Sequence, residues 1–275
     1  MAATALEGRS PAFIYRHTVL VRITHWINVV CITFLLMSGL QIFNAHPALY
    51  VGQKSDFDHP VLAMTARNTP DGPVGETTIL GHSFDTSGIL GMSYYDGVPR
   101  ARGFPSWITV PSYQDLATGR RWHFFFAWLF FINGAVYLAA SLATRHIWRD
   151  LVPSWSQIRA IGPTIWHHLK LKFPHEREYN VLQKLTYLTM VAGVLPLVVL
   201  TGLTMSPGVN AIVPWLVEVF GGRQTARTIH FICATLIVLF ILVHVLLVLV
   251  SGVWNNLRSM VTGRYRVDVA GGDHG

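Results

Sequence analysis

The chain has 275 residues, of which 51% are hydrophobic and only 13% are charged, with a mean hydropathy of +0.40 and a formal net charge of +7. A soluble domain carries about 25% charged residues, so this composition excludes an ordinary water-soluble enzyme. It also excludes a nucleic-acid-binding protein, because the basic excess comes with few charges and many aromatic residues. The composition therefore indicates an integral membrane protein whose main partner is lipid.

Four apolar runs in the sequence are long enough to cross the ~30 Å of bilayer hydrocarbon as helices. The expected fold class is all-α: a single membrane domain over residues 1–275, built as an integral membrane four-helix bundle. No internal repeat is evident. The four expected spans are residues 23–43, 122–143, 185–203 and 229–250.

The distribution of Lys and Arg predicts the orientation. An even number of spans places both termini on one side of the membrane. The two terminal tails and the connection between the second and third spans hold 13 of the 21 Lys and Arg residues. Because cytoplasmic segments carry the basic excess, we expect a multi-pass protein of the bacterial inner membrane with both termini in the cytoplasm.

The first two spans are joined by a long outer segment, residues 44–121. It is rich in glycine and proline, contains the turn dipeptides Asp71-Gly72 and Asp96-Gly97, and shows no clear helical or strand periodicity. We expect an irregular loop that covers the outer end of the bundle. A flexible linker is the alternative.

Four of the 13 histidines fall within the expected spans: His25, His123, His230 and His244. An ionisable residue inside a membrane span is rare and indicates a functional site. His230 and His244 are 14 residues apart on one helix, which places them on nearly the same face and ~21 Å apart along its axis.

Depth decides how these histidines pair. His123 and His230 match near the outer side, whereas His25 and His244 match near the inner side with a mismatch of ~6 Å by helical rise. Imidazole is an axial ligand of haem iron, and an apolar four-helix interior suits a porphyrin. The sequence thus predicts two bis-histidine haem sites with these four histidines as the metal ligands.

Arginine and glycine residues support haem as the cofactor. Arg22, Arg120 and Arg227 each precede one of the four histidines by three residues, which places a guanidinium near the same helix face. Arginine binds carboxylates through paired donors, so these residues are candidate partners of haem propionates. Gly39 and Gly134 are candidate positions where a helix backbone approaches the macrocycle closely.

These residues resemble a known family. The histidine pair of the fourth span, His25-Trp26, the Arg-x-x-His that opens the second span, and the Tyr-Asn-x-x-Gln-Lys segment at 179–184 are similar to the di-haem cytochrome b subunits of nickel–iron hydrogenases and the gamma subunit of formate dehydrogenase. The resemblance implies two non-covalent haem b groups. It also implies a membrane anchor that passes electrons between a periplasmic redox enzyme, of molybdenum or hydrogenase type, and the quinone pool. By the same resemblance, Asn180 would donate a hydrogen bond to a quinone carbonyl. Two axial histidines leave no open iron position, so substrate chemistry would belong to the partner.

Two alternative functions remain at this point. The first is a stand-alone superoxide:quinone oxidoreductase, in which Arg100, Arg102, Arg120 and Arg121 would steer the anion. The second is a histidine-based proton or metal transporter, which would be colourless. A visible spectrum separates the transporter from the haem protein.

Overall fold

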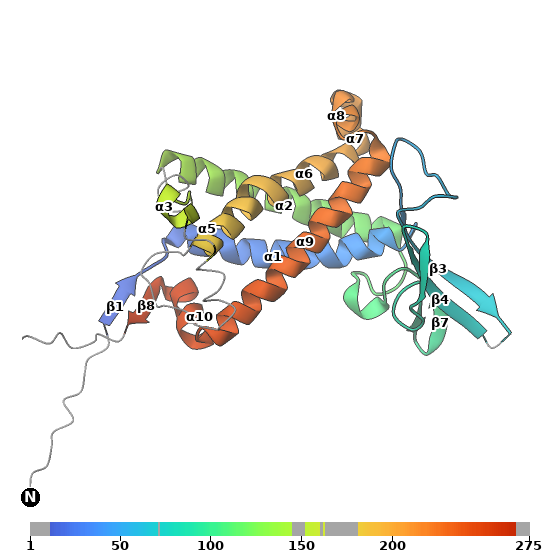
Figure 1. The fold of residues 1–275 in the computed structure, drawn as a ribbon, viewed down its shortest axis with the longest axis horizontal. Helices are drawn as coiled ribbons and strands as arrows, with labels where there is room; N and C mark the ends of the chain where they lie inside the picture. The colour runs from blue at the N-terminus through green and yellow to red at the C-terminus, as the bar shows by residue number, and fades with distance from the viewer. Residues whose placement is uncertain (1–11, 71, 145–151, 160–161, 163–180, 268–275) are drawn as a thin grey trace, which may run out of the picture.

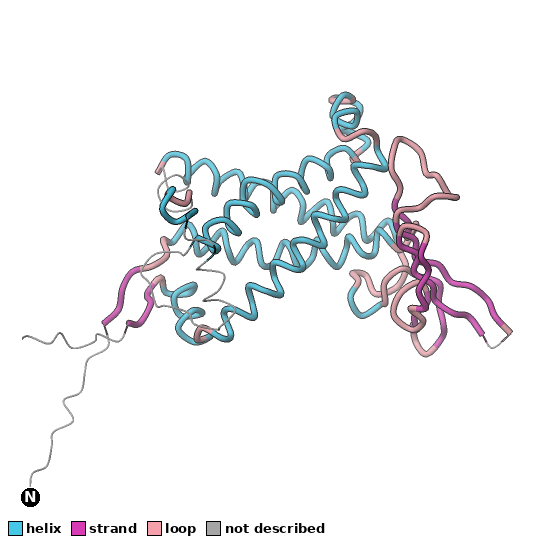
Figure 2. The backbone as a smooth tube through the Cα atoms, in the orientation of Figure 1, coloured by secondary structure: helices cyan, strands magenta, loops and turns pink. Residues whose placement is uncertain are grey.

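The structure is a computed structural model that describes residues 12–70, 72–144, 152–159, 162 and 181–267. Its centre is a bundle of four long helical spans that lie side by side, with strands at both ends (Figures 1 and 2). All four are long and apolar enough to cross a membrane, which confirms the four expected spans. They are α1 (Val19–Phe43), α2 (Leu116–Ala143), a composite span (Val181–Thr204) and α9 (Arg223–Val250).

The composite third span contains a break in its α-helical hydrogen bonding. It consists of α5 (Val181–Leu188), a π-helical turn η3 (Thr189–Val194) and α6 (Leu195–Thr204). Pro196 lies two residues after the end of the π-helical turn and has no N–H to donate to a preceding carbonyl, so the regular ladder is interrupted here.

Polar capping residues start the first two spans ahead of the predicted apolar runs. Thr18 caps α1 by accepting a hydrogen bond from the Val21 N–H, and Asp115 caps α2 by accepting from the Ala117 and Thr118 N–H groups. Hydropathy detects only the part of a helix that crosses hydrocarbon, so α1 and α2 start four and six residues earlier than the apolar runs do.

The start of α9 is capped by the segment that joins α1 and α2. The Gly52 carbonyl accepts hydrogen bonds from the Gln224 and Thr225 N–H groups at 3.0 and 3.3 Å. Gly222 permits this contact, because its φ is +116° and a Cβ there would lie 2.5 Å from the Gly52 oxygen. The first turn of α9 is therefore satisfied by backbone from a distant part of the chain.

The expectation of an all-α fold is wrong in one respect, because the segment between α1 and α2 contains β-structure. A four-stranded antiparallel sheet has the order β2-β3-β4-β5, and β6 pairs with β7 in a separate hairpin. A further two-stranded sheet joins β1 to β8. The elements of the segment are β2 (Ala48–Leu49), β3 (Leu62–Thr69), β4 (Gly72–Ile79), β5 (His82–Asp85), β6 (Met92–Tyr95), β7 (Val98–Ala101) and the short 3-10 helix η1 (Ser106–Ile108).

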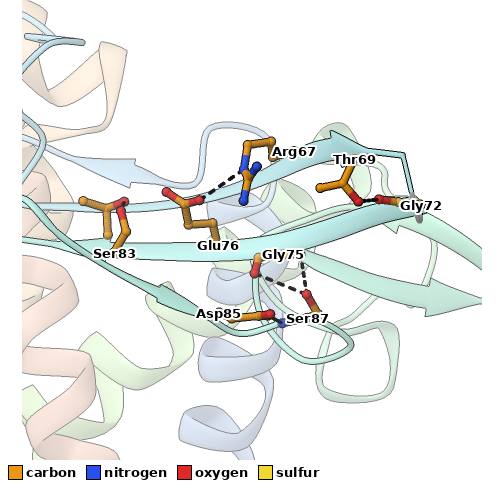
Figure 3. Close-up of polar contacts among 9 residues, drawn as sticks. Arg67, Thr69, Gly72, Gly75, Glu76, Ser83, Asp85 and Ser87 are labelled. Carbon is orange, nitrogen blue, oxygen red and sulfur yellow. Dashed lines mark hydrogen bonds and ion pairs between the residues drawn. The ribbon is translucent and has the colours of Figure 1, made fainter.

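Tight turns and polar contacts set the shape of these strands. The β4–β5 and β6–β7 connections are two-residue turns, Leu80-Gly81 and Asp96-Gly97, in which all four residues have positive φ. Across β3 and β4, Arg67 pairs with Glu76 at 3.5 Å, and the Ser87 hydroxyl accepts from the Gly75 N–H at 2.8 Å (Figure 3).

Hydrogen bonds fasten this segment to α1. Asn44 exchanges two hydrogen bonds with the Phe104 backbone, and the Gln41 amide donates to the Tyr113 carbonyl at 2.9 Å. The side chains of Asn44 and Gln41 are both buried at the end of α1. The segment is thus neither the expected irregular loop nor a free linker, but a small β-structure bonded to the bundle.

We call the end of the bundle that carries β2–β7 the sheet end, and the opposite end, which carries β1 and β8, the terminal end (Figure 1). At the terminal end, the Trp26 indole donates to the Met260 carbonyl at 3.1 Å, which joins α1 to α10. The remaining elements are β1 (Ala12–Tyr15), α3 (Trp155–Arg159), α7 (Pro207–Ile212), α8 (Trp215–Val219), α10 (Val253–Thr262) and β8 (Arg264–Val267).

Candidate functional site

The sheet-end histidine pair comes from α2 and α9. His123 and His230 are each the eighth residue of their helix, and their ring centroids lie 6.3 Å apart with an interplanar angle of 64°. Both helices begin at the sheet end, so equal sequence positions give equal depths. The structure therefore brings together the two residues that the sequence pairs on the outer side.

The terminal-end pair comes from α1 and α9. His25 is the seventh residue of α1 and His244 the seventh from the end of α9, and their ring centroids lie 6.4 Å apart. The expected depth mismatch of ~6 Å is wrong. It arose from placing the start of the first span at residue 23, whereas α1 begins at Val19.

Each sheet-end histidine is held by the helix next to it. The His123 Nδ1 lies 3.1 Å from the Leu35 carbonyl and 3.1 Å from the Ser38 hydroxyl of α1. The His230 Nδ1 lies 2.9 Å from the Val198 carbonyl and 3.2 Å from the Thr201 hydroxyl of α6. A carbonyl only accepts, so Nδ1 carries the hydrogen in both rings and Nε2 keeps its lone pair for a metal.

Glycine lets the neighbouring helix approach each of these rings. A Cβ built at Gly39 would lie 3.3 Å from the His123 Cε1, and one at Gly202 would lie 3.3 Å from the His230 Cε1. Gly39 thus lies beside the His123 ring of the sheet-end pair. A Cβ built at Gly134 meets no described atom within 4 Å outside its own helical surroundings, so the space beside this glycine is open, and its approach to the macrocycle stays a prediction.

The three arginines that precede histidines have only neutral partners in the described residues. Arg227 donates to the His46 carbonyl and lies 5.5 Å from the centroid of the Phe43 ring. Arg22 donates to the Val261 carbonyl, and its buried Nε has no partner among the described atoms. Arg120 lies over the ring of Phe124. None of the three contacts a carboxylate within the described parts of the chain, so each guanidinium has donors left for an acidic ligand.

The terminal-end pair has a less polar surrounding. The Trp26 ring lies edge-on to His25 at 5.4 Å, and the Phe240 ring stacks on His244 at 5.7 Å. The His25 Nδ1 is buried and has no hydrogen-bond partner among the described atoms.

His17 lies just outside the first span. Its burial, together with the charges of Arg16, His25 and Arg22, lowers its pKa to about 4, so its imidazole is neutral at pH 7.

An apolar layer separates the two histidine pairs. Between the levels of His230 and His244, Cys233 and Ile237 of α9 pack against Met190 and Val194 of η3. Between α1 and α2, Cys31 of α1 packs against two phenylalanines of α2, Phe126 and Phe130. This layer excludes water between the two sites.

The donor set of the two sites fits haem. Each pair offers two imidazoles whose centroids lie 6.3 or 6.4 Å apart, glycines let two helices pack closely against the sheet-end rings, and an arginine lies within a turn of three of the four histidines. The residues that sequence reasoning missed here are Ser38, Thr201 and Gly202. One expected residue, Asn180, lies outside the described residues.

Comparisons with known proteins identify the family of the chain. The chain is 28% identical over 249 residues to the putative protein-methionine-sulfoxide reductase subunit YedZ1 of Azospira oryzae, a match that covers 90% of this chain and 96% of that protein. No solved structure matches the chain. Residues 16–263 match the family described as prokaryotic cytochrome b561. Because this match spans most of the sequence and all four helical spans, the chain belongs to the prokaryotic cytochrome b561 family of haem b membrane proteins.

Proposed function

We propose that this protein is a di-haem b membrane subunit that passes electrons between a periplasmic redox enzyme and the quinone pool. The observation that carries the proposal is the presence of two facing histidine pairs at two depths of one bundle, with ring centroids 6.3 and 6.4 Å apart. His25, His123, His230 and His244 are the proposed axial ligands. One pair lies towards each end of the bundle, which allows electrons to cross most of the bilayer.

The separation of the rings supports axial ligation. A metal–imidazole bond is about 2 Å long, and the ring centre lies roughly 1 Å beyond the nitrogen, so two imidazoles on opposite sides of one metal ion have centres about 6 Å apart. Both pairs meet this requirement. The two levels are separated by 14 residues of α9, or ~21 Å of helix.

A bound haem supplies reversible one-electron chemistry, and the residues of this chain determine where and how it is held. The four imidazoles would hold two haems, two imidazoles to each, and would thereby keep small ligands such as oxygen from the iron. Arg22, Arg120 and Arg227 are proposed to hold the propionates near the water interface. The apolar layer between the pairs keeps the path dry.

We place the terminal end in the cytoplasm because the tails and the connection between the second and third spans hold most of the Lys and Arg residues. Quinone reduction on this side would take protons from the cytoplasm. By resemblance to the di-haem family, Asn180 is the proposed hydrogen-bond donor to a quinone carbonyl.

We place the redox partner at the sheet end. The relative from Azospira oryzae is named as a reductase subunit, which supports a partner enzyme for this chain too. Electrons that enter at the sheet end meet the His123–His230 pair first, and the β-structure there extends beyond the ends of the helices (Figure 1). A molybdenum or hydrogenase-type enzyme is the proposed partner class.

Substitutions at two exposed apolar residues, Leu80 in the β4–β5 turn and Phe84 in β5, test this docking surface. Leu80 and Phe84 are 72% and 53% exposed, and we expect Leu80→Asp together with Phe84→Asp to reduce co-purification of the partner at least tenfold, because both place a charge in an apolar contact. Aspartate tolerates the positive φ of 49° at residue 80, so the turn should persist. The matched control is Ile212→Asp in α7, which is 82% exposed but lies outside the β-structure. Undiminished co-purification of the double variant would place the partner elsewhere.

One observation weighs against the superoxide-oxidising alternative. Arg102, a member of the proposed steering set, is 2% exposed and donates to the Phe104 carbonyl, the Ser112 carbonyl and the Thr109 hydroxyl. It therefore braces the loop between β7 and α2 instead of attracting an anion from solvent.

The experiment that tests the proposed function is a redox titration of the visible spectrum of the purified full-length protein. Two haem transitions with a stoichiometry of two haem b per chain are expected, because each histidine pair binds one. A colourless protein would favour the transporter, and one haem per chain would refute the di-haem arrangement.

A further inference from the structure

The surroundings of His123 and His230 repeat each other. In each case the imidazole Nδ1 contacts a backbone carbonyl and a hydroxyl of the adjacent helix, and a glycine follows the hydroxyl directly. The carbonyls belong to Leu35 and Val198, and the hydroxyls to Ser38 and Thr201. The two histidines thus lie in two copies of the same pocket.

The sequences of these pockets are similar over short segments. Leu-Leu-Met-Ser-Gly-Leu at 35–40 and Val-Val-Leu-Thr-Gly-Leu at 198–203 have residues of the same type at each position. In the partner helices, Gly-Arg-Arg-Trp-His-Phe at 119–124 shares its first Arg, its His and its Phe with Ala-Arg-Thr-Ile-His-Phe at 226–231. The α1–α2 and α6–α9 pairs are therefore equivalent around the sheet-end site, and the hydroxyl is retained as Ser in one copy and as Thr in the other.

The hydrogens in each pocket can be assigned from chemistry. The Ser38 hydroxyl donates its only hydrogen to the Phe34 carbonyl at 2.5 Å, and the Thr201 hydroxyl donates to the Leu197 carbonyl at 2.7 Å. Each hydroxyl oxygen is then an acceptor for the imidazole. The Nδ1–H is thus shared between a carbonyl and a hydroxyl, which fixes the ring's tautomer and rotation.

We propose that Ser38 and Thr201 are positioning residues that raise the basicity of His123 and His230 and thereby lower the redox potential of the haem held between them. This inference rests on the proposed function. A hydrogen bond from the distal N–H of a metal-bound imidazole makes it a stronger electron donor, which favours the oxidised metal. At the terminal end, by contrast, the buried Nδ1 of His25 has no such acceptor among the described atoms.

The test is a redox titration of full-length variants that remove one hydroxyl each, Ser38→Ala and Thr201→Val. We expect the midpoint potential of one of the two haem transitions to rise in each variant and to rise further, by about the sum, in the double variant. The other transition should stay in place. The electron paramagnetic resonance signal of the same haem should shift with it, while the haem-to-protein ratio stays at two.

Conservative variants and controls distinguish a hydroxyl effect from a packing effect. Ser38→Thr and Thr201→Ser exchange the residues of the two copies and should keep the original potential. Thr33→Val and Thr204→Val are controls on the same two helices. Each removes a hydroxyl that bonds only to a carbonyl of its own helix, so the midpoint potential should stay unchanged.

The outcomes are decisive in both directions. An unshifted potential in the double variant, or an equal shift in the Thr33 and Thr204 controls, overturns the inference. If Ser38→Ala loses its haem, retention of haem and potential by Ser38→Thr supports it, and loss in both overturns it. Failure of the proposed function looks different, since the unmodified protein would then lack two haem transitions.

Discussion

Replacing His230 or His123 by alanine is expected to remove the same haem, and replacing His244 or His25 is expected to remove the other. Each single variant should bind one haem per chain instead of two, because a site left with one imidazole loses an axial bond to the iron. Helix α9 provides one histidine to each pair. The ring centroids of His230 and His123 lie 6.3 Å apart, and those of His244 and His25 lie 6.4 Å apart. The measurement is the haem content of purified protein, together with the potential of the haem that remains.

Because the histidines act in pairs, the potential of the remaining haem tests the assignment more strictly than the haem content alone. The variants of His123 and His230 should retain a haem of one potential, and those of His25 and His244 a haem of the other. A double His230→Ala, His244→Ala variant should retain none. The control is His46→Ala, since His46 is also a half-buried histidine near the sheet end, and its hydrogen bond with Arg227 is made by its backbone carbonyl, which alanine retains. Loss of haem in that control, or a different grouping of the four variants, would contradict the assignment.

The positions of the histidines along the sequence were sufficient to predict which of them meet. Helical rise converts sequence spacing into depth, and four long spans leave few ways to match depths. The error at the terminal end came from equating the edge of an apolar run with the end of a helix. Arg22, Arg120 and Arg227 all lie inside helices but outside the apolar runs, because a helix continues into the interface where its charged residues meet water.

The β-structure at the sheet end was missed for a physical reason. Four of its six strands, β2, β5, β6 and β7, have four residues or fewer, and β5 and β7 are exposed along their whole length, so no alternation of apolar and polar residues marks them. One usable signal was present at Asp96-Gly97, a dipeptide that favours the two-residue turn found there.

Ser38 and Thr201 were missed because a hydroxyl inside a membrane helix most often bonds to its own backbone, as both also do here. Single residues of this kind carry little information. The informative signal was the repetition of a hydroxyl followed by glycine at equivalent positions of two spans, which becomes meaningful once the structure places both beside a histidine.

Valine at Gly39 is expected to weaken haem binding at the sheet end strongly. A Cβ there already lies 3.3 Å from the His123 Cε1, so the two further methyl groups of valine must displace the ring or the helix. Overpacking of this kind costs about 1–3 kcal/mol, which corresponds to roughly 5- to 150-fold in affinity. Gly202→Val should have the same effect through His230, whose Cε1 lies at the same distance from the built Cβ.

Gly193→Val provides the matched control for these two variants. It makes the same substitution in a membrane span, but Gly193 is exposed on the third span and a Cβ there meets no described atom within 4 Å outside its own helical surroundings, so both haems should bind with unchanged potentials. The measurement is haem content during titration of the apoprotein with haem, which reports affinity and stoichiometry together. Unimpaired binding in Gly39→Val would mean that α1 does not confine the imidazole of His123, whereas equal losses in all three variants would show a general effect of valine on the bundle. Selective loss at the sheet end in the first two variants would locate the narrow contact that holds each imidazole between two helices.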